Sequence, residues 1–451
     1  HISPGTMATC RSLTALLCLQ ALVEAAATAA PTCEAEACRR SGLSLFQKRY
    51  NTKLKALGEQ ETANNSISFI YTVGCDHYEL VQAVVLDHSW REIGNQGRLT
   101  RIVVDCKDEA AQELLRSSPL KDDKSFNVFY AQGDLMTVPG DKGRYPARGR
   151  PYAIMQWLEA ERPQEPVVAI LDPDFVFARP VSSHPDLPKV RPGQMLAQRY
   201  DLGTDFIGGF KEAGEEAPAL TFDEAVDSYS TGPPWVLHME DLRAMLPDWG
   251  RYTDSWPEEK GLLREQDAFC MAALKHNVPS LGQNIFMASN PIAWHEAWSE
   301  KDSRLGSWEP YVLHYCQTYK YGNWSFYKSL IADDFYAGEF QNEVPGPLHC
   351  GAPLLQEPPS PPAEEADRSK FMNAWMLWKL FPAMNKAFAA YQEMYCPSEK
   401  ATKVGGQTLM RTMQPKPCNA RTTTRYRVTP GQDASWLSTG VRGDDPCVEA
   451  A

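Results

Sequence analysis

The sequence lacks several features that would mark other classes of protein. Its 451 residues carry a net charge of −12, and the missing basic excess argues against a nucleic-acid binder, which needs a broad basic surface. It has no Cys-x-x-Cys pair, which argues against a zinc ribbon or a thioredoxin-like redox site. It has no internal repeat. Its hydrophobic content of 43% and charged content of 23% are typical of a globular protein.

A long apolar run is also missing at the N-terminus. Residues 1–6 are interpreted as a translation scar and are left out of the fold. Arg11 precedes the apolar run Leu13–Val23, and small residues follow up to Ala30. Because a membrane-spanning helix needs about 20 apolar residues, this layout favours a signal peptide over the alternative, a short type II membrane anchor. Residues 1–30 are therefore predicted to be a scar followed by a signal peptide.

Cysteine usage agrees with export. Two of the twelve cysteines lie before the predicted cleavage site, and the other ten are dispersed through the chain. These ten are Cys33, Cys38, Cys75, Cys106, Cys270, Cys316, Cys350, Cys396, Cys418 and Cys447. An even number of cysteines in an exported protein favours disulfides, although one sequence does not reveal their pairing. Two glycosylation sequons, at Asn64 and Asn323, add weak support.

Residues 67–344 are predicted to form one α/β domain after an N-terminal stem, residues 31–66. The predicted strands are rich in β-branched, aromatic or other apolar residues and cover 68–73, 99–105, 126–130 and 167–171. A helical pattern follows the first strand, and another helix is predicted to begin at Pro151. This alternation implies a central, mostly parallel sheet with right-handed crossovers.

The C-terminal part is predicted to be a separate extension. Residues 345–367 are rich in proline and acidic residues, which is typical of a linker. Residues 368–451 are predicted to be helical in the aromatic-rich segment Phe371–Tyr395 and loop-rich beyond it. Pro382 and Lys379 argue against a membrane span there. Because a proline-rich, acidic stretch rarely carries a core, we expect this part to be separable from the α/β domain.

The motif that carries chemistry is Asp172-Pro173-Asp174, directly after the apolar run Val167–Leu171. Ligands of open α/β sheets bind outside the carboxyl ends of the strands. Hard divalent cations prefer oxygen ligands and bridge carboxylates to substrate phosphates. The alternative is a solvated loop, but the chain returns at once to apolar character at Phe175-Val176-Phe177. The pattern therefore favours a metal site.

Further candidates lie along the chain. Arg148 and Arg150 precede a predicted helix, where a basic loop suits a phosphate group, and a solvated basic loop is the alternative. Glu265 and Asp267 open another predicted helix. Asp267 lies on its apolar stripe, where an acid is costly unless paired or used; the alternative is a charge that caps the helix dipole. His314 lies in a short apolar segment and, taken alone, is more often a core histidine than a ligand.

Four segments, in this order, resemble one known family of transferases. They are Arg150–Leu158, Ile170–Asp174, Ser230–Trp235 and Leu313–Tyr315. They are similar to the plant and algal family of hydroxyproline O-arabinosyltransferases and peptidyl serine α-galactosyltransferases, and the resemblance covers roughly residues 67–330. The Leu-Asp-Pro-Asp and Gly-Pro-Pro sequences resemble the serine galactosyltransferase branch more closely.

The resemblance implies a GT-A-type glycosyltransferase fold, a UDP-sugar donor, a divalent metal such as Mn²⁺, and retention of anomeric configuration. It implies that Asp172 and Asp174 bind the metal and the diphosphate, with His314 as a late metal ligand. The other predicted site residues, grouped by their expected role, are Tyr71, Thr72, Arg148 and Arg150 for the donor, Glu265 and Asp267 for catalysis, and Gly232, Pro233, Pro234 and Trp235 for the acceptor side.

The predicted function is transfer of galactose or arabinose from a UDP-sugar to serine or hydroxyproline hydroxyls of secretory glycoproteins. The family implies the lumen of the endoplasmic reticulum or Golgi, and the signal peptide also allows secretion; membrane association is left open. Two alternatives remain. A glycoside hydrolase needs two carboxylates flanking a sugar bond, which the Asp-Pro-Asp motif does not supply by itself. An inactive lectin-like module would keep the fold without turnover.

Overall fold

The computed structural model describes residues 66–396 with internal gaps. The residues not described within this range are 141–142, 201, 256–260, 262, 285, 292, 294–295, 297–308, 323, 329–345, 351, 353 and 363–366. The predicted scar and signal peptide, nearly all of the stem, the asparagines of both sequons and the tail beyond residue 396 lie outside the described residues.

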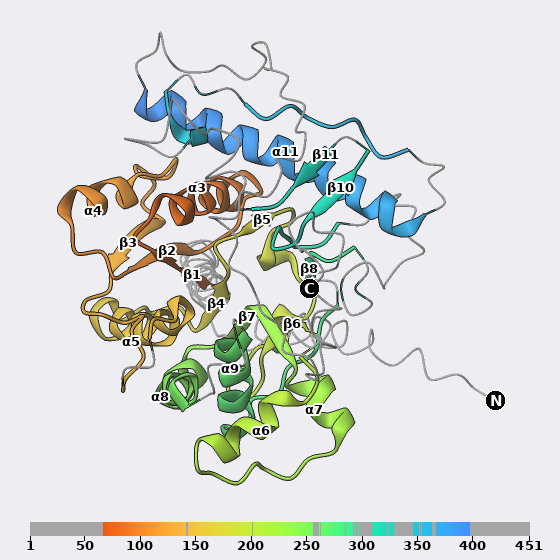
Figure 1. Ribbon diagram of the computed structural model, residues 1–451. Helices are drawn as coiled ribbons and strands as arrows, with labels where there is room; N and C mark the ends of the chain where they lie inside the picture. The colour runs from red at the N-terminus through yellow and green to blue at the C-terminus, as the bar shows by residue number, and fades with distance from the viewer. Residues whose placement is uncertain are drawn as a thin grey trace, which may run out of the picture. The chain divides into compact units, whose positions relative to one another are not determined.

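The centre of the fold is a six-stranded sheet in the order β3-β2-β1-β4-β7-β6 (Figure 1). Its strands are β1 (Ile67–Gly74), β2 (Arg98–Val104), β3 (Phe126–Tyr130), β4 (Val167–Leu171), β6 (Leu196–Arg199) and β7 (Thr231–His238). β1 pairs in parallel with β2 and β4, and β2 with β3. Only β7 runs against its neighbours β4 and β6. The α/β class and the mostly parallel central sheet are confirmed.

Helices cover both faces of the sheet. The described helices are α3 (His77–Glu92), α4 (Glu109–Arg116), α5 (Gly149–Glu161), α6 (Asp205–Glu212), α7 (Phe222–Ser228), α8 (Met239–Ser255), α9 (Arg264–Lys275) and α11 (Arg368–Tyr395), with short 3-10 turns η1 (Pro146–Arg148), η2 (Val181–Ser183), η3 (Leu187–Lys189) and η6 (Gly346–Leu348). In Figure 1, α3 and α11 lie on one side and α5, α8 and α9 on the other. Among the described residues, no helix is both long and apolar enough to span a membrane.

Side-chain alternation along the central strands explains their continuous apolar runs. In β4, Val167, Ala169 and Leu171 join the hydrophobic core beneath α3, while Val168 and Ile170 join the core beneath α5, α8 and α9. Successive side chains of a strand point to opposite faces. A strand covered on both sides therefore needs apolar residues at every position.

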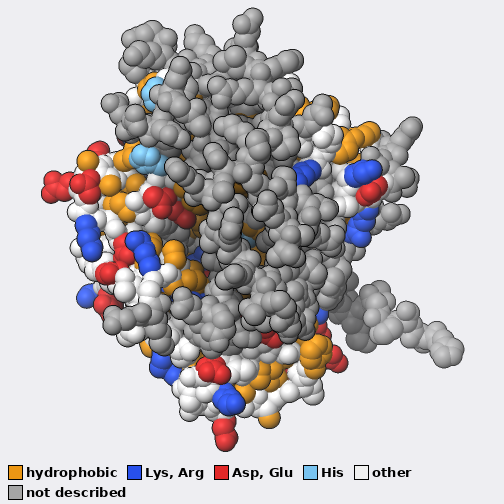
Figure 2. Space-filling view, viewed as in Figure 1, with side chains coloured by type: hydrophobic (Ala, Val, Ile, Leu, Met, Phe, Trp, Pro, Cys, Tyr) orange, Lys and Arg blue, Asp and Glu red, His pale blue; other side chains and the backbone are white. Residues whose placement is uncertain are grey.

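A smaller sheet lies beside the carboxyl end of β4. It has the order β5-β9-β8 and consists of β5 (Phe175–Phe177), β9 (Val312–His314) and β8 (Met287–Ala288). A hairpin of β10 (Tyr319–Tyr321) and β11 (Trp324–Phe326) follows and packs on α11. Positive and negative side chains are interspersed over the described part of the face seen in Figure 2.

The C-terminal part differs from the sequence-based expectation. α11 packs on α3, and Trp375, Phe381 and Phe388 belong to the same hydrophobic core as β1 and β4. Hydrogen bonds also attach the proline-rich segment to α11. The Asn385 side chain bonds both backbone polar groups of Leu355, at 2.7 and 2.8 Å. This packing argues against a separable extension, because removing α11 would expose the core over α3.

Two disulfides are formed among the described cysteines. Cys75–Cys106 joins the chain after β1 to the chain after β2, and Cys350–Cys396 joins the proline-rich segment to the end of α11. Cys270 and Cys316 are free. Disulfides are characteristic of proteins that fold in an oxidising compartment.

Candidate metal centre

Strand pairing brings the Asp-Pro-Asp motif to a distant histidine. Asp172 and Asp174 follow the end of β4, and β5 begins at once with Phe175. β5 pairs with β9 in a register that places Phe175 opposite His314. The backbone N–H of Tyr315 donates to the carbonyl of Asp174 at 3.2 Å, which fixes this register. The imidazole thus lies beside both carboxylates.

The three side chains form a compact, buried cluster, which we call the triad. Nε2 of His314 lies 3.1 Å from Oδ1 of Asp174 and 3.8 Å from Oδ2 of Asp172. One ligand atom from each residue lies within 4.8 Å of the others, and the three residues are exposed by only 3–6%. Two carboxylates and a neutral imidazole form a donor set that suits Mn²⁺-like divalent cations. The triad therefore fits a divalent metal ion.

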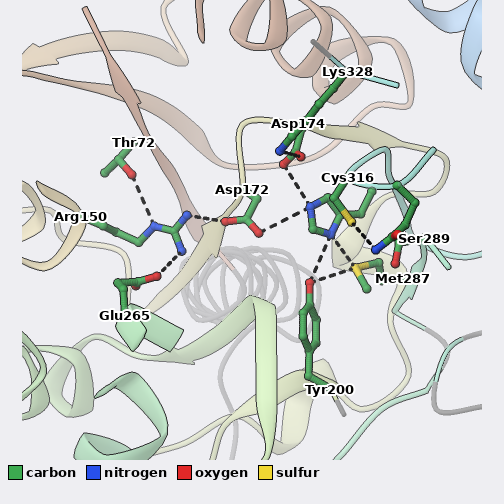
Figure 3. A network of polar contacts seen from close by, with 12 residues as sticks. Thr72, Arg150, Asp172, Asp174, Tyr200, Glu265, Met287, Ser289, Cys316 and Lys328 are labelled. Atoms are coloured by element: carbon green, nitrogen blue, oxygen red, sulfur yellow. Dashed lines mark hydrogen bonds and ion pairs between the residues drawn. The ribbon is translucent and has the colours of Figure 1, made fainter. Parts of the chain in front are cut away.

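Two cations flank the triad, one on each carboxylate (Figure 3). Arg150 forms an ion pair with Asp172, and Nζ of Lys328 lies 2.7 Å from Oδ2 of Asp174. Burial by itself would raise the pKa of Asp174, but His314 and Lys328 overcome it and hold that pKa well below its usual range. The centre thus combines two carboxylates with cationic groups that can also face an anionic ligand.

Arg150 connects the triad to Glu265. Its other guanidinium nitrogens lie 3.3 Å from Oε2 of Glu265 and 3.5 Å from the hydroxyl of Thr72. Oε1 of Glu265 is buried and has no hydrogen-bond partner among the described residues. Burial raises the pKa of Glu265 to about 7, against the lowering effect of Arg150. Asp267 is buried two residues further along α9.

Some predicted residues lie elsewhere. The Tyr71 hydroxyl belongs to a buried network with Asp87 and Arg101, because alternation along β1 turns Tyr71 and Thr72 to opposite faces. Arg148 forms an ion pair with Asp254 instead, at 2.6 Å. The structure does not bring the side chains of Tyr71 and Arg148 into the cluster.

The predicted acceptor segment lies within β7. Trp235 stacks on Phe269 in the core, with ring centroids 3.9 Å apart, and the Arg150 guanidinium lies over its ring at 5.9 Å. Gly232, Pro233 and Pro234 are buried in the same strand. Their contact with an acceptor stays a prediction.

Sequence reasoning missed three groups near the triad. Lys328 follows β11, in a segment with no motif that singles it out. Tyr200 follows β6, and its hydroxyl lies 3.2 Å from Nδ1 of His314. Glu79, in the first turn of α3, has a buried oxygen without a hydrogen-bond partner among the described residues, and burial raises its pKa to about 8. Its position after the carboxyl end of β1 could have selected it.

Comparison with known proteins gives two sequence relatives, while no family model matches the chain. A peptidyl serine α-galactosyltransferase of Arabidopsis thaliana is 25% identical over 275 residues, which cover 58% of this chain and 31% of that protein. One of Chlamydomonas reinhardtii is 23% identical over 380 residues, which cover 74% and 47%. This chain is a relative of the peptidyl serine α-galactosyltransferases. It spans about a third to half of the length of these curated relatives.

The relationship to the peptidyl serine α-galactosyltransferases agrees with the resemblance seen in the motifs. It supports the family as a whole more strongly than the serine galactosyltransferase branch within it. Among solved structures, a bifunctional glycosyltransferase named WbbM is similar with a TM-score of 0.36 and 10% identity, over 55% of this chain and 45% of that one. A TM-score of that size does not establish a shared fold.

Proposed function

We propose that this protein is a metal-dependent glycosyltransferase with a GT-A-type arrangement. It transfers a sugar from a UDP-sugar to serine or hydroxyproline hydroxyls of secretory glycoproteins, with retention of configuration. The observation that carries the proposal is the buried triad of Asp172, Asp174 and His314 in a relative of the peptidyl serine α-galactosyltransferases. The names of these relatives support serine as the acceptor and galactose as the sugar; arabinose is the alternative sugar.

The triad would hold the metal ion, for which Mn²⁺ is our choice. When bound, such an ion stabilises the negative charge that develops on a leaving nucleoside diphosphate. Arg150 and Lys328 support this reading, because each pairs with one carboxylate of the triad. The Lys328 side chain is 36% exposed and can turn from Asp174 toward a phosphate oxygen.

Glu265 and Asp267 are the proposed acidic residues beside the reacting sugar. Glu265 supports this role because one of its oxygens is buried without a hydrogen-bond partner among the described residues, while Arg150 holds the other. A carboxylate beside the anomeric carbon stabilises an oxocarbenium-like transition state, and its free oxygen can accept a hydrogen bond from a sugar hydroxyl. Thr72 and Arg150 are proposed to bind the donor.

The decisive experiment is a screen of UDP-sugars with Mn²⁺ and a peptide rich in serine and hydroxyproline. We expect UDP release that depends on both metal and peptide, together with a peptide heavier by one sugar. The double variant Asp172→Asn/Asp174→Asn is the control. Metal-independent cleavage of glycosides would favour the hydrolase, and sugar binding without turnover would favour the lectin-like module.

The proposed compartment is the lumen of the endoplasmic reticulum or Golgi, or the outside of the cell. The disulfides Cys75–Cys106 and Cys350–Cys396 support an oxidising environment. N-terminal sequencing of material from the secretory pathway tests this, and we expect a mature start near Pro31. An intact Met7 in membrane-embedded protein would contradict the cleaved signal peptide.

A further inference from the structure

The ring nitrogen of His314 that points away from the carboxylates has its own partners. Nδ1 lies 3.2 Å from the hydroxyl of Tyr200 and 3.3 Å from Sδ of Met287. The Tyr200 hydroxyl itself lies 3.5 Å from the same sulfur. By these distances the imidazole lies between the two aspartates and the pair Tyr200 and Met287, and Figure 3 shows those four residues. His314 therefore links the two carboxylates of the triad to a pair of uncharged side chains, those of Tyr200 and Met287.

Gly232 determines where the Tyr200 ring can lie. A Cβ atom at Gly232 would come within 2.4, 2.5 and 2.6 Å of Cε2, Cδ2 and Cζ of that ring. Real Cβ atoms essentially never approach other atoms closer than 3.0 Å. Gly232 does not have a positive φ, so its backbone conformation does not require glycine. The reason for glycine here is the space that it leaves for Tyr200.

We propose that Tyr200 is a positioning residue for the metal ligand His314, and that Gly232 makes room for it. The inference rests on the proposed metal centre. A histidine that binds a metal through Nε2 carries its proton on Nδ1, and that proton needs an acceptor to fix the tautomer and the ring plane. The Tyr200 oxygen is the stronger acceptor, because a thioether sulfur accepts only weakly. The tyrosine hydroxyl can then donate to Met287.

This assigns the Gly-Pro-Pro segment a role at the metal centre. Tyr200 follows β6, Gly232 lies on the neighbouring strand β7, and His314 ends β9 of the smaller sheet. Contact between Gly232 and the Tyr200 ring therefore links the central sheet to the imidazole. The simpler alternative is that Tyr200 only fills space, in which case its hydroxyl is dispensable.

The first test is Tyr200→Phe, which keeps the ring and removes only the hydroxyl. Binding of Mn²⁺ is measured by electron paramagnetic resonance with UDP present, together with the melting temperature. Outer-shell partners of metal-bound histidines are typically worth about 10–100-fold in metal affinity, so we expect at least about 10-fold weaker Mn²⁺ binding with a melting temperature close to wild type. The matched control is Tyr252→Phe, which loses a hydroxyl bonded to Glu215 at 2.6 Å on the other side of the sheet.

The second test is Gly232→Ala, which displaces the ring. Its matched control is Gly250→Ala, where the new Cβ would lie 3.0 Å from the ring of Tyr152. If Gly232 acts through the Tyr200 hydroxyl, adding Gly232→Ala to Tyr200→Phe weakens Mn²⁺ binding little further. Independent effects would multiply instead, and that result would overturn the role of Gly232.

The outcomes separate this inference from the proposed function. A folded Tyr200→Phe protein with wild-type Mn²⁺ affinity would overturn the positioning role and leave the metal centre standing. Wild-type protein that binds no Mn²⁺, with or without UDP, would overturn both. Because Tyr200→Phe changes no volume beyond one oxygen atom, it remains a test even if Gly232→Ala does not fold.

Discussion

Two arginines lie near the central sheet, Arg101 fully buried and Arg150 nearly so, and their surroundings differ in one respect. Arg101 on β2 pairs with Asp87 and lies 2.9 Å from the Tyr71 hydroxyl. Asp87 also accepts hydrogen bonds from Tyr71 and Ser118. Each of these side-chain polar groups is thus matched inside the protein. A network in which every member is matched stabilises the fold and has no capacity left for a ligand.

Arg150 on α5 has partners of the same kind, but one of these partners is not fully matched. It pairs with Asp172 and Glu265, and Glu265 keeps one buried oxygen without a hydrogen-bond partner among the described residues. The neighbouring Lys328 and His314 add cationic groups beside Asp174. Unmatched buried polar atoms and perturbed pKa values are typical of functional sites. The difference between the two networks therefore indicates where a ligand belongs.

Replacing an aspartate of the triad should have the largest effect on activity. Asp172→Asn or Asp174→Asn keeps the side-chain shape but removes a charged metal ligand. Transition-state charge stabilisation by a metal is worth several kcal/mol, so turnover should fall by about 100-fold or more while the protein stays folded. Steady-state rates at limiting Mn²⁺ and the melting temperature are the measurements. Near-wild-type turnover would remove the motif from the site.

An aspartate-to-asparagine change in the network around Arg101 should affect stability and not activity. Asp87→Asn leaves the buried Arg101 without its counter-ion, which typically costs about 3 kcal/mol or more of unfolding free energy. Turnover per folded molecule should stay close to wild type. Urea unfolding combined with an activity assay of the folded fraction separates the two. A stable but inactive Asp87→Asn protein would show that the comparison between the networks is wrong.

His314→Ala should raise the metal requirement. Burial lowers the pKa of His314, but Asp174 and Cys316 raise it more. The metal-free imidazole therefore keeps its proton at pH values at which an ordinary histidine has lost it. Protons then compete with the metal, and activity should fall as pH decreases, with partial rescue by added Mn²⁺. Because loss of an outer-shell partner alone typically costs about 10–100-fold in metal affinity, we expect about a 100-fold higher Mn²⁺ requirement for His314→Ala, which loses the ligand itself, and a milder change for His314→Asn. An unshifted Mn²⁺ titration in folded His314→Ala protein would favour a core histidine.

Lys328→Met should weaken donor binding. A hydrogen bond to a charged group is worth roughly 1.5–3 kcal/mol, so KM for the UDP-sugar should rise by about 10-fold with a smaller change in kcat. Lys386→Met, which removes an exposed ion pair with Glu92, is the control. An unchanged KM would mean that Lys328 serves only to neutralise Asp174.

Apart from the loss of turnover expected for a proposed catalytic acid, Glu265→Gln should have a smaller effect, seen in the pH dependence of stability. Burial raises the pKa of Glu265 to about 7 from an ordinary value of 4.5. The folded state thus favours the neutral acid, and this stabilisation is complete below about pH 4.5 and lost as pH rises through about 7. The glutamine variant is neutral throughout, so between about pH 5 and about pH 8 it should lose about 2–3 kcal/mol less stability than wild type. Equal pH slopes in urea unfolding would contradict this.

Local patterns predicted the elements that carry the site. The strands at 126–130 and 167–171 have the predicted bounds, because apolar runs flanked by turn residues identify buried strands. The position of Asp172 and Asp174 after β4 followed from the same pattern. Tyr71 and Thr72 are both predicted to bind the donor, although alternation along β1 turns adjacent side chains to opposite faces of the sheet.

Non-local pairing explains what the sequence did not reveal. His314 meets Asp174 only through the three-residue pairing of β5 with β9, and Lys328 reaches it from beyond the β10–β11 hairpin. Such register is not encoded in either segment alone. Residues 345–367 are predicted to be a linker because they are rich in proline and acidic residues. The backbone of this segment is held by amide side chains of α11, and Gln392 bonds the carbonyls of Pro347 and Ala352.

The β5–β9 pairing also bears on how the protein is made. During synthesis the chain emerges from its N-terminus, so both carboxylates leave the ribosome well before the imidazole and the lysine that complete their surroundings. A nascent chain that ends before β9 has β4 and β5 but no partner strand to hold Asp174 against a histidine. We therefore expect tight Mn²⁺ binding to appear late in biosynthesis, so that the metal marks a finished domain and does not guide its early folding.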